Sequence, residues 1–357
     1  MKKHNLFGKS LSELETFVLE LGEKKFRATQ LFEWLYKERV SSFQEMLNLS
    51  IPLREKLEQN ACIERLNIVS KQTSLLDNTV KFLFQLFDEK KIESVVIPPR
   101  TTAVDVDTRL TLCVSTQVGC PLDCKFCATA SMGFLRNLTA SEILNQVILA
   151  QQQSTRPITN IVFMGMGEPM LNYDNVMNAI DILTSPTGFA MSPRRITVST
   201  AGYVQQIRKM ADEGRKVKLA LSLHSLDSAT RLQIMPITKK YNVDELLDAL
   251  EYYHHITKKG VMLEYILFDG VNDSDSDVAK LIKVSRRFEC KVNLIPYHSI
   301  QFTNPQGFAA TLRGVSEEKM LSFARKLRDG NVDVFIRNSS GVDIDAACGQ
   351  LAINSAA

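Results

Sequence analysis

The sequence predicts an α/β fold with a parallel sheet, because two patterns alternate from Thr108 to the end of the chain. Runs of branched and aromatic residues, typical of strands, alternate with runs whose apolar residues recur at helical spacing. The repeat is about 30 residues long, which is the length of one β/α unit. Six or more such units imply a partial or closed barrel or a doubly wound sheet, with functional residues at the carboxyl ends of the strands.

Residues 1–65 are expected to form a helical module before this core. Apolar residues recur at i, i+3, i+4 and i+7 in two segments, as on one face of a helix. They are Leu14, Phe17, Val18 and Leu21 in the first segment and Phe32, Leu35 and Tyr36 in the second.

Residues 66–105 predict a short strand-rich adaptor between the module and the core. The runs LNIVS, TVKFLFQLF and IESVVIP are rich in branched and aromatic residues. Asp77 and Asn78 mark a break between two of these runs, and Pro98-Pro99 marks a boundary.

Residues 106–342 are expected to form the core, and residues 343–357 a C-terminal tail. Thr139 and Glu142 form a T-x-x-E capping box, which predicts the start of one helix. The strand-like runs of the core are RLTLCVS, NIVFMGM, RITVST, VKLALSLHS, VMLEYILF, KVNLIPY and VDVFIR.

The composition is that of an ordinary globular protein. The chain has 357 residues, of which 45% are hydrophobic and 23% charged, and its formal net charge is +3. That charge is too small for nucleic-acid binding to be inferred from it. Glu20 interrupts the only early apolar stretch, and no segment approaches ~18 uninterrupted apolar residues. We therefore expect a cytoplasmic protein with no membrane segment.

Three of the seven cysteines are clustered, which indicates metal binding or catalysis in a chain expected to keep its thiols reduced. Cys120, Cys124 and Cys127 follow the first core strand with the spacing C-x₃-C-x₂-C. A structural zinc site needs four ligands, whereas three thiolates on an iron–sulfur cluster leave one iron open for a ligand. A zinc site completed by a distant His or Cys is the alternative.

A glycine-rich segment, MGMGEP, ends the second core strand. Gly167 allows the backbone to approach a ligand closely, and Glu168 offers a carboxylate to an amine or hydroxyl group. Alone this segment is also compatible with an ordinary turn.

Together these motifs resemble the RlmN/Cfr family of radical S-adenosylmethionine (SAM) RNA adenine methyltransferases. The similarity spans about residues 90–352. The blocks that carry it are VSTQVGCPLDCKFCATASMGF, ITNIVFMGMGEPMLNYDNV, SPRRITVSTAG, LALSLHS, MPITKKYNVDELL, NLIPY and GVDIDAACGQL. The resemblance implies a partial (β/α)₆ barrel with an N-terminal helical accessory domain that binds RNA and a short β adaptor.

The resemblance also implies the cofactors and their ligands. One [4Fe-4S] cluster would be held by the three clustered cysteines, and two SAM molecules would be consumed per turnover. The residues implied to bind SAM are Gly167, Glu168, Ser199, Ser222, Leu223, His224 and His298. His298 stands where the family commonly has Asn.

Three further residues acquire catalytic roles through the resemblance. Cys348 in the tail would carry the methyl group as S-methylcysteine, and Cys113 would release the product by forming a transient disulfide with Cys348. Glu93 would be the proton acceptor. A thiolate is nucleophilic enough to take a methyl group from SAM, whereas C2 of adenine is not.

The implied activity is methylation of C2 of an adenosine in the peptidyl-transferase region of 23S rRNA and of adenosine 37 in tRNAs. The expected protein is a monomer that uses an electron donor such as flavodoxin. A Cfr-type enzyme that methylates C8 and a zinc-stabilised RNA-binding protein without catalysis are the alternatives. The N-terminal module could supply phosphate contacts, and so could the pairs Arg194-Arg195, Arg208-Lys209, Arg215-Lys216 and Lys239-Lys240. Any one basic pair taken alone is more typical of a solvated surface.

Overall fold

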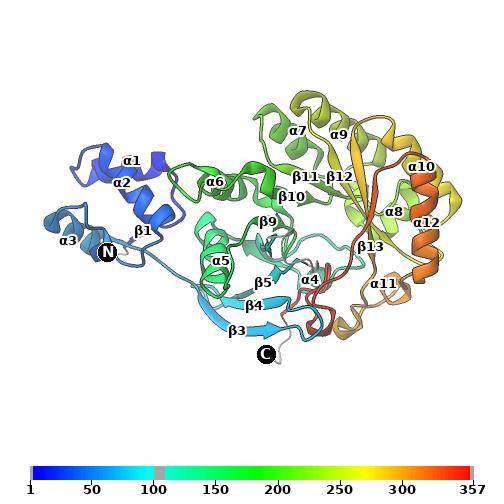
Figure 1. Cartoon of the computed structure of the whole chain (residues 1–357), viewed down its shortest axis with the longest axis horizontal. Helices are drawn as coiled ribbons and strands as arrows, with labels where there is room; N and C mark the ends of the chain where they lie inside the picture. Colours follow the sequence, from blue (N-terminus) through cyan, green and yellow to red (C-terminus); the bar gives the residue numbers. More distant parts are fainter. Residues whose placement is uncertain (1–2, 100–108, 354–357) are drawn as a thin grey trace.

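The structure is a computed structural model that describes residues 3–99 and 109–353. A small helical module at the N-terminus, blue in Figure 1, extends from one end of a larger α/β body. The predicted boundary between adaptor and core, at residues 105 and 106, lies outside the described residues. Within the described part of the chain, no helix is long and apolar enough to cross a membrane.

The N-terminal module packs its predicted apolar residues inward. The residues that formed the helical pattern are buried, except for Leu21, which is partly buried. The module consists of α1 (Leu11–Glu20), α2 (Phe26–Phe32), a π-helical continuation of α2 (Glu33–Glu38), α3 (Ile51–Asn60), and the short parallel strands β1 (His4–Asn5) and β2 (Ala61–Cys62).

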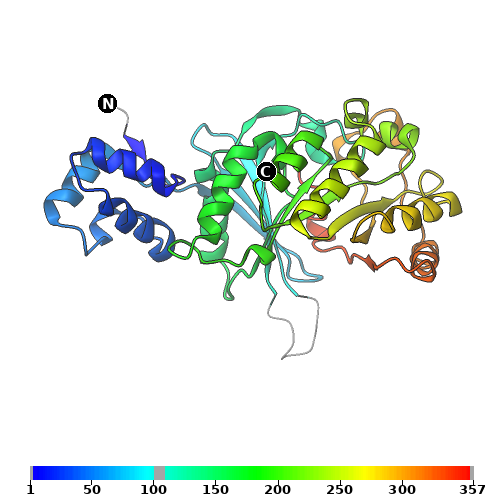
Figure 2. The ribbon, with the colours of Figure 1, turned by 90° about the horizontal axis from the view of Figure 1, so that it is seen from above.

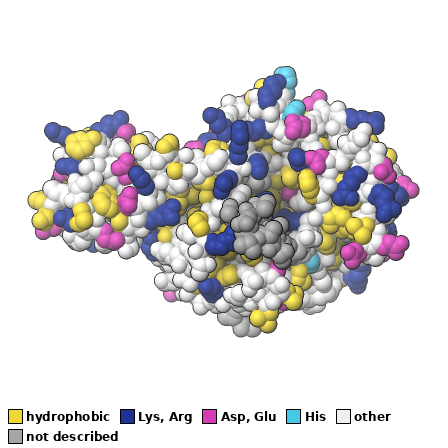
Figure 3. Space-filling model, in the orientation of Figure 1, with side chains coloured by type: hydrophobic (Ala, Val, Ile, Leu, Met, Phe, Trp, Pro, Cys, Tyr) yellow, Lys and Arg dark blue, Asp and Glu magenta, His cyan; other side chains and the backbone are white. Residues whose placement is uncertain are grey.

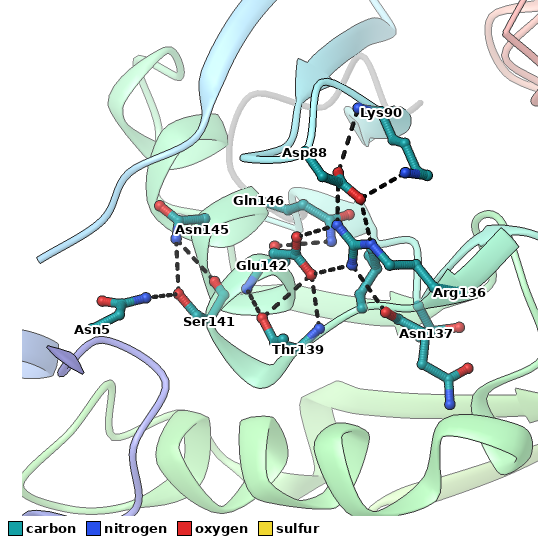
Figure 4. A network of polar contacts seen from close by, with 12 residues as sticks. Asn5, Asp88, Lys90, Arg136, Asn137, Thr139, Ser141, Glu142, Asn145 and Gln146 are labelled. Atoms are coloured by element: carbon teal, nitrogen blue, oxygen red, sulfur yellow. Dashed lines mark hydrogen bonds and ion pairs between the residues drawn. The ribbon is translucent and has the colours of Figure 1, made fainter. Parts of the chain in front are cut away.

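Polar contacts attach this module to helix α5 (Ala140–Gln152) of the body. The amide group of Asn5 donates to Ser141 Oγ at 3.1 Å, and the amide group of Asn145 donates to the Glu64 carbonyl at 3.3 Å. Figure 4 shows Asn5 and Asn145 both directed at Ser141. A Cβ atom at Gly8 would lie 2.4 Å from the Ser141 backbone nitrogen, so only glycine permits this close approach.

One ten-stranded sheet runs through the body, in the order β14-β13-β12-β11-β10-β9-β6-β5-β4-β3. The strands of this sheet from β6 to β14 are parallel, whereas β3, β4, β5 and β6 pair antiparallel. The strands are β3 (Asn67–Thr73), β4 (Val80–Gln85), β5 (Lys91–Ile97), β6 (Thr111–Cys113), β9 (Asn160–Phe163), β10 (Ile196–Thr200), β11 (Lys218–Ser222), β12 (Val261–Leu267), β13 (Cys290–Pro296) and β14 (Val334–Ile336). The adaptor strands therefore extend the sheet of the core.

The parallel part consists of six β/α units and a last strand, β14, so the predicted partial (β/α)₆ barrel is confirmed. Figures 1 and 2 show the helices around the outside of the sheet. The main helices after α5 are α6 (Tyr173–Thr184), α7 (Val204–Asp212), α9 (Val243–Thr257), α10 (Asp275–Ser285) and α12 (Glu317–Asp329), and the short ones are α4 (Ala128–Ser131), α8 (Ser228–Ile234) and α11 (Phe308–Thr311).

Arg136 connects three segments near the start of the core. It lies on β8 (Phe134–Asn137), which pairs with β7 (Gln117–Gly119) in a hairpin. Its guanidinium group donates to Asp88 at 2.8 and 2.9 Å and to Glu142 at 2.9 and 2.7 Å (Figure 4). Arg136 holds the pKa of Asp88 well below its ordinary value. Glu142 also completes the predicted capping box with Thr139 at the start of α5.

Gly119 ends β7 in a conformation and a space that only glycine fits. Its φ angle is +73°, and a Cβ atom there would lie 1.8 Å from the Gly133 carbonyl oxygen. The same carbonyl accepts a hydrogen bond from the backbone N–H of Cys120 at 2.9 Å. The entry to the cysteine loop therefore depends on the missing side chain of Gly119.

We predict that Gly119→Ala lowers the free energy of unfolding by about 3 kcal/mol or more. The left-handed conformation alone costs roughly 1–2 kcal/mol for alanine, and the overlap with Gly133 adds to it. Gly214→Ala is the matched control, because Gly214 has a φ of +62° and a Cβ atom there would meet no heavy atom within 4 Å. Thermal and urea unfolding would measure both changes, and equal losses in the two variants would contradict the prediction.

Candidate active site

The three clustered cysteines lie in one loop between β7 and α4. Cys120 directly follows β7, and Cys127 directly precedes α4. The Cys127 N–H donates to the Cys124 carbonyl at 3.1 Å, which closes the turn between them. All three residues line one cavity of about 140 Å³ at the carboxyl ends of the parallel strands.

Burial disfavours the negatively charged form of these thiols. It raises the pKa of Cys120 to about 12 and also raises the pKa values of Cys124 and Cys127. Positive metal charge would reverse this effect, because a bound metal stabilises thiolates. The donor set therefore fits a metal centre.

A single metal ion and an iron–sulfur cluster require different arrangements of their ligands. Within residues 3–99 and 109–353, no group of three or more His, Cys, Asp or Glu side chains is arranged to hold one metal ion. One zinc ion would need four ligands at about 2.0–2.3 Å. In an iron–sulfur cluster each thiolate binds a different iron, so the sulfurs stand farther apart.

Glu168 presents a buried carboxylate to the same cavity. Its Oε1 accepts from the Met170 N–H at 3.0 Å, and its Oε2 accepts from the Ala201 N–H at 2.7 Å. Burial raises the pKa of Glu168 to about 7, although these donors lower it. The described residues provide no ion-pair partner for it, so the site suits a ligand with a positively charged amino group.

Gly167, the neighbour of Glu168, brings the backbone close to β7. Its φ angle is +100°, and a Cβ atom would lie 2.5 Å from Gln117 Cβ. The Glu168 N–H donates to Gln117 Oε1 at 2.9 Å. Glycine at this position thus fixes the direction in which the Glu168 side chain leaves the backbone.

His224 offers an unpartnered hydrogen-bond donor to the cavity. Its Nδ1 accepts from the Ile266 N–H at 3.0 Å, and burial lowers its pKa to about 3. The neutral ring therefore carries its proton on Nε2. Nε2 is buried without a partner in the described structure, as expected if a bound ligand supplies the acceptor.

Of the four remaining residues implied to bind SAM, two line the cavity and two do not. Ser199 on β10 and Ser222 on β11 line the cavity with Glu168 and His224. Leu223 is fully buried in the hydrophobic core, and its carbonyl accepts from Arg231 at 3.0 Å. His298 is half-buried, contacts Ser339 and does not line the cavity. The roles of Leu223 and His298 stay predictions.

The C-terminal tail is docked against the cysteine loop. The Ala128 N–H donates to the Gly349 carbonyl at 2.6 Å, and Thr129 Oγ1 donates to the Leu351 carbonyl at 2.6 Å. A Cβ atom at Gly349 would lie 3.0 Å from the Phe126 carbonyl oxygen, so glycine permits this contact. The tail thereby places Cys348 in the lining of the cavity.

The adaptor holds the other side of the tail. Ser74 Oγ donates to Asp343 Oδ1 at 2.7 Å, and the Gly341 N–H donates to Asp77 Oδ2 at 3.0 Å. Lys81 Nζ donates to the Asp345 carbonyl at 3.4 Å. The tail is therefore fixed between the antiparallel strands and the cysteine loop.

Cys113, at the end of β6, lies near Cys348. Burial raises the pKa of Cys113 to about 12, the charge of Cys348 raises it further, and Arg337 lowers it. Arg337 also lines the cavity, and its pKa is raised chiefly by Cys348. The structure thus brings together two thiols that lie 235 positions apart in the sequence. The guanidinium group of Arg337 lies beside them.

Glu93 lies on β5 beside the tail and forms an ion pair with Lys81. Lys81 Nζ is 3.3 Å from Glu93 Oε1, and Oε2 is buried without a hydrogen-bond partner. Burial raises the pKa of Glu93, whereas Lys81 lowers it. A carboxylate with one free buried oxygen and a raised pKa has the properties of a general base.

Sequence reasoning missed three charged residues at the site. Glu264 on β12 lines the cavity, accepts from Asn293 Nδ2 at 2.8 Å and is 4.0 Å from Arg337 Nη1. Two of them could have been noticed in the sequence. Glu264 is an acidic residue within the apolar run VMLEYILF, and Arg337 is an arginine at the end of the strand-like run VDVFIR. Arg231 had no comparable signal.

Arg231 joins the ends of β10 and β11 from a buried position. Its guanidinium group donates to the carbonyls of Ala201 at 2.7 Å, Ser222 at 3.2 Å and Leu223 at 3.0 Å, and to Thr238 Oγ1 at 2.8 Å. Only 1% of its surface is exposed, and burial lowers its pKa to about 10. It satisfies carbonyls that the parallel strands leave unpaired where they separate.

Comparisons with known proteins match both parts of the chain. Residues 4–63 match the family described as "Ribosomal RNA large subunit methyltransferase N-terminal domain", and residues 114–282 match the radical SAM superfamily. A protein of Flavobacterium johnsoniae described as a probable dual-specificity RNA methyltransferase RlmN is 42% identical over 99% of this chain and 98% of its own length. One of Thermotoga maritima with the same description is 42% identical over 97% of both chains.

A solved structure agrees with these matches. The crystal structure of a radical SAM methyltransferase from Sphaerobacter thermophilus superposes with a TM-score of 0.86 and 38% identity, covering 98% of this chain and 99% of that chain. The likeness therefore includes the N-terminal module, the adaptor, the barrel and the tail.

We predict that Arg231→Met lowers the free energy of unfolding by about 3–5 kcal/mol, because several buried acceptors lose their donor. Arg231→Lys is expected to lose less, since one ammonium group can serve part of the set. Arg287→Met, which removes an exposed ion pair with Asp248 and Glu251, is the control and should cost about 1 kcal/mol or less. Urea unfolding measures all three, and an Arg231→Met loss no larger than the control would refute the assigned role.

Proposed function

Because the chain belongs to the RlmN family of dual-specificity RNA methyltransferases within the radical SAM superfamily, we propose that it methylates C2 of adenosine. The proposed targets are an adenosine in the peptidyl-transferase region of 23S rRNA and adenosine 37 in tRNAs. The radical SAM superfamily implies SAM and a [4Fe-4S] cluster as cofactors. We propose one cluster per chain and two SAM molecules consumed per turnover.

The observation that carries this proposal is the position of Cys348. A thiol from the far end of the chain lines the same cavity as Cys120, Cys124 and Cys127, and it lies close enough to Cys113 to influence its pKa. An enzyme that only generated a radical would have no use for a fourth and a fifth cysteine at this site. A methyl carrier and a thiol that releases it would use both.

The cofactors would be held by residues whose geometry suits them. The three loop cysteines would hold the cluster, and Glu168, Ser199, Ser222 and His224 would contact SAM. When bound, the cluster and SAM supply the electron and the radical that takes a hydrogen atom from a methyl group on Cys348. Glu168 suits the amino group of SAM, and the free Nε2–H of His224 suits an acceptor on it.

Cys348 acts first as a nucleophile. Its thiolate takes a methyl group from SAM, which leaves as S-adenosylhomocysteine, and a new S–C bond forms. The guanidinium group of Arg337 lies beside Cys348. After hydrogen removal the methylene group bonds to C2 of adenine, so protein and RNA are joined through the sulfur of Cys348.

Glu93 and Cys113 complete the reaction. One electron would return from the adduct to the oxidised cluster that the loop cysteines would hold, and the free oxygen of Glu93 accepts the proton from C2. The thiolate of Cys113 then attacks the sulfur of Cys348, the S–C bond breaks, and the released carbon takes a proton to become the methyl group. The resulting disulfide requires two electrons from a cellular thiol reductant before the next turnover.

We further propose a monomeric enzyme of the cytoplasm that takes its electrons from a flavodoxin-type donor. All seven cysteines are free thiols in the structure, which is the state that a reducing compartment maintains. RNA substrates follow from the family, and the choice between rRNA and tRNA belongs to the proposal.

We predict that Cys113→Ala accumulates a covalent protein–RNA adduct, because Cys348 still receives the methylene group but cannot be released. Cys348→Ala should form no adduct. Denaturing gel electrophoresis after reaction with radiolabelled RNA measures this, and Cys290→Ala is the control, since Cys290 begins β13 away from the cavity. Absence of adduct from Cys113→Ala, with the iron content of the native enzyme, would refute the carrier role of Cys348.

We also predict that the methylated product is 2-methyladenosine. Digestion of the reacted rRNA and mass spectrometry against C2- and C8-methyladenosine standards identifies the carbon. A product methylated only at C8 would reject the C2 assignment and leave the Cfr-type activity.

An enzyme purified without air should contain iron, and zinc in its place would support a non-catalytic RNA-binding protein.

A further inference from the structure

Basic residues gather where the parallel strands begin, on the side of the barrel opposite the cavity. Each lies within two residues of the first residue of β6, β10, β11 or β12. We call this surface the strand-start face and define it by Arg109, Arg194, Arg195, Lys216, Lys218 and Lys259. Because neighbouring parallel strands begin at the same edge, these side chains from distant parts of the sequence are brought together.

Five cations of the strand-start face differ from other surface cations in the carboxylate partners that the described residues provide. Among the described residues, Arg194, Arg195, Lys216, Lys218 and Lys259 make no ion pair. In contrast, the cations Arg215, Arg287 and Lys319 each pair with two carboxylates. The described carboxylates therefore leave the positive charge of these five residues unneutralised.

These cations also lie close enough to repel one another. The pKa of Lys259 is lowered by burial and by Arg194, Lys216 and Lys218. The pKa of Lys218 is lowered by burial and by Arg109 and Lys291. Lys291 itself is paired with Asp333 at 2.6 Å. An anion bound across the face would relieve this repulsion.

A hollow continues the strand-start face toward the N-terminal module. It has a volume of about 620 Å³ and is lined by Arg195 and Ser192 from the barrel and by Arg39 from the module. The guanidinium group of Arg39 lies over the ring of Phe189, 4.9 Å from its centroid. Neither arginine has an ion pair among the described residues. Figure 3 shows Lys and Arg side chains spread over the module and the adjoining part of the body.

The strand-start face is remote from the reacting groups. Arg195 directly precedes β10, whereas Ser199 lies near its other end and lines the cavity. Ser199 lies four positions after Arg195, which corresponds to roughly 13 Å along a strand. An electron donor must approach the cysteine loop at the opposite ends of the strands, so this face is poorly placed for an acidic redox protein.

We propose that the strand-start face and the adjoining hollow bind the phosphate backbone of the RNA substrate, away from the adenosine that enters the cavity. This inference rests on the proposed function. Phosphate contacts orient an RNA without reading its bases, so unpaired lysines and arginines suffice. A folded RNA would then be held on two sides of the barrel.

The test compares two variants of the full-length enzyme with equal net charge. K216Q/K218Q/K259Q removes three cations of the strand-start face, and K280Q/K319Q/K326Q removes three cations paired with Asp227, Asp269, Asp273 and Asp275. The probe is an unmodified transcript of the peptidyl-transferase region of 23S rRNA, and its dissociation constant is measured from 50 to 400 mM KCl. K216R/K218R/K259R keeps the charge, and thermal unfolding confirms that each variant is folded.

The first variant should bind the transcript about 10- to 100-fold more weakly at 100 mM KCl. Its slope of log affinity against log salt should be shallower by about 2–3, because each phosphate contact contributes roughly 0.7–0.9. The arginine variant should bind like the native enzyme, and the paired-cation control should change the dissociation constant less than about 3-fold.

Equal binding and equal slopes in all variants would overturn the inference. So would normal RNA binding combined with slower reduction by flavodoxin, which would assign the strand-start face to an acidic protein. If the variants bind alike but the native enzyme still forms 2-methyladenosine, only this inference fails. If the slopes change as expected but no 2-methyladenosine forms, the proposed reaction fails and the RNA-binding face stands.

Discussion

The contact between the C-terminal tail and the cysteine loop is the constraint on which the rest of the site depends. Hydrogen bonds from the Ala128 N–H to the Gly349 carbonyl and from the Thr129 hydroxyl to the Leu351 carbonyl hold two segments together that are more than 200 residues apart in sequence. They place Cys348 in the cavity that the loop cysteines line. Without this contact the barrel would still present three thiols, but Cys348 would not be held beside them.

The adaptor strands give the tail its second support. They extend the parallel sheet with antiparallel strands, so Ser74, Asp77 and Lys81 reach the tail, and Glu93 forms an ion pair with Lys81. Thus the adaptor contributes both a docking surface and a buried carboxylate. This explains physically why a region of short strands belongs to the same functional unit as the barrel.

Charge is distributed differently on the two ends of the strands. At the carboxyl ends, Glu168, Glu264 and three buried thiols favour a positively charged ligand, and Arg337 supplies only part of that charge. At the strand starts, Arg194, Arg195, Lys216, Lys218 and Lys259 make no ion pair with the described carboxylates. The two ends of the barrel therefore suit ligands of opposite charge, a cationic one at the cavity and, as we propose, the RNA backbone at the strand-start face.

The sequence by itself determined the order of the β/α units, the capping box at Thr139, the cysteine motif and the family, because these depend on local periodicity and short spacing. It also indicated the residues that the resemblance carried, among them Glu168 and Cys348. Only the tertiary structure decided that Arg231 joins β10 to β11 and that Glu264 and Arg337 line the cavity. It also decided that Lys218 and Lys259 share a face. These relations arise when strands distant in sequence become neighbours, and a linear pattern does not record which strand ends meet.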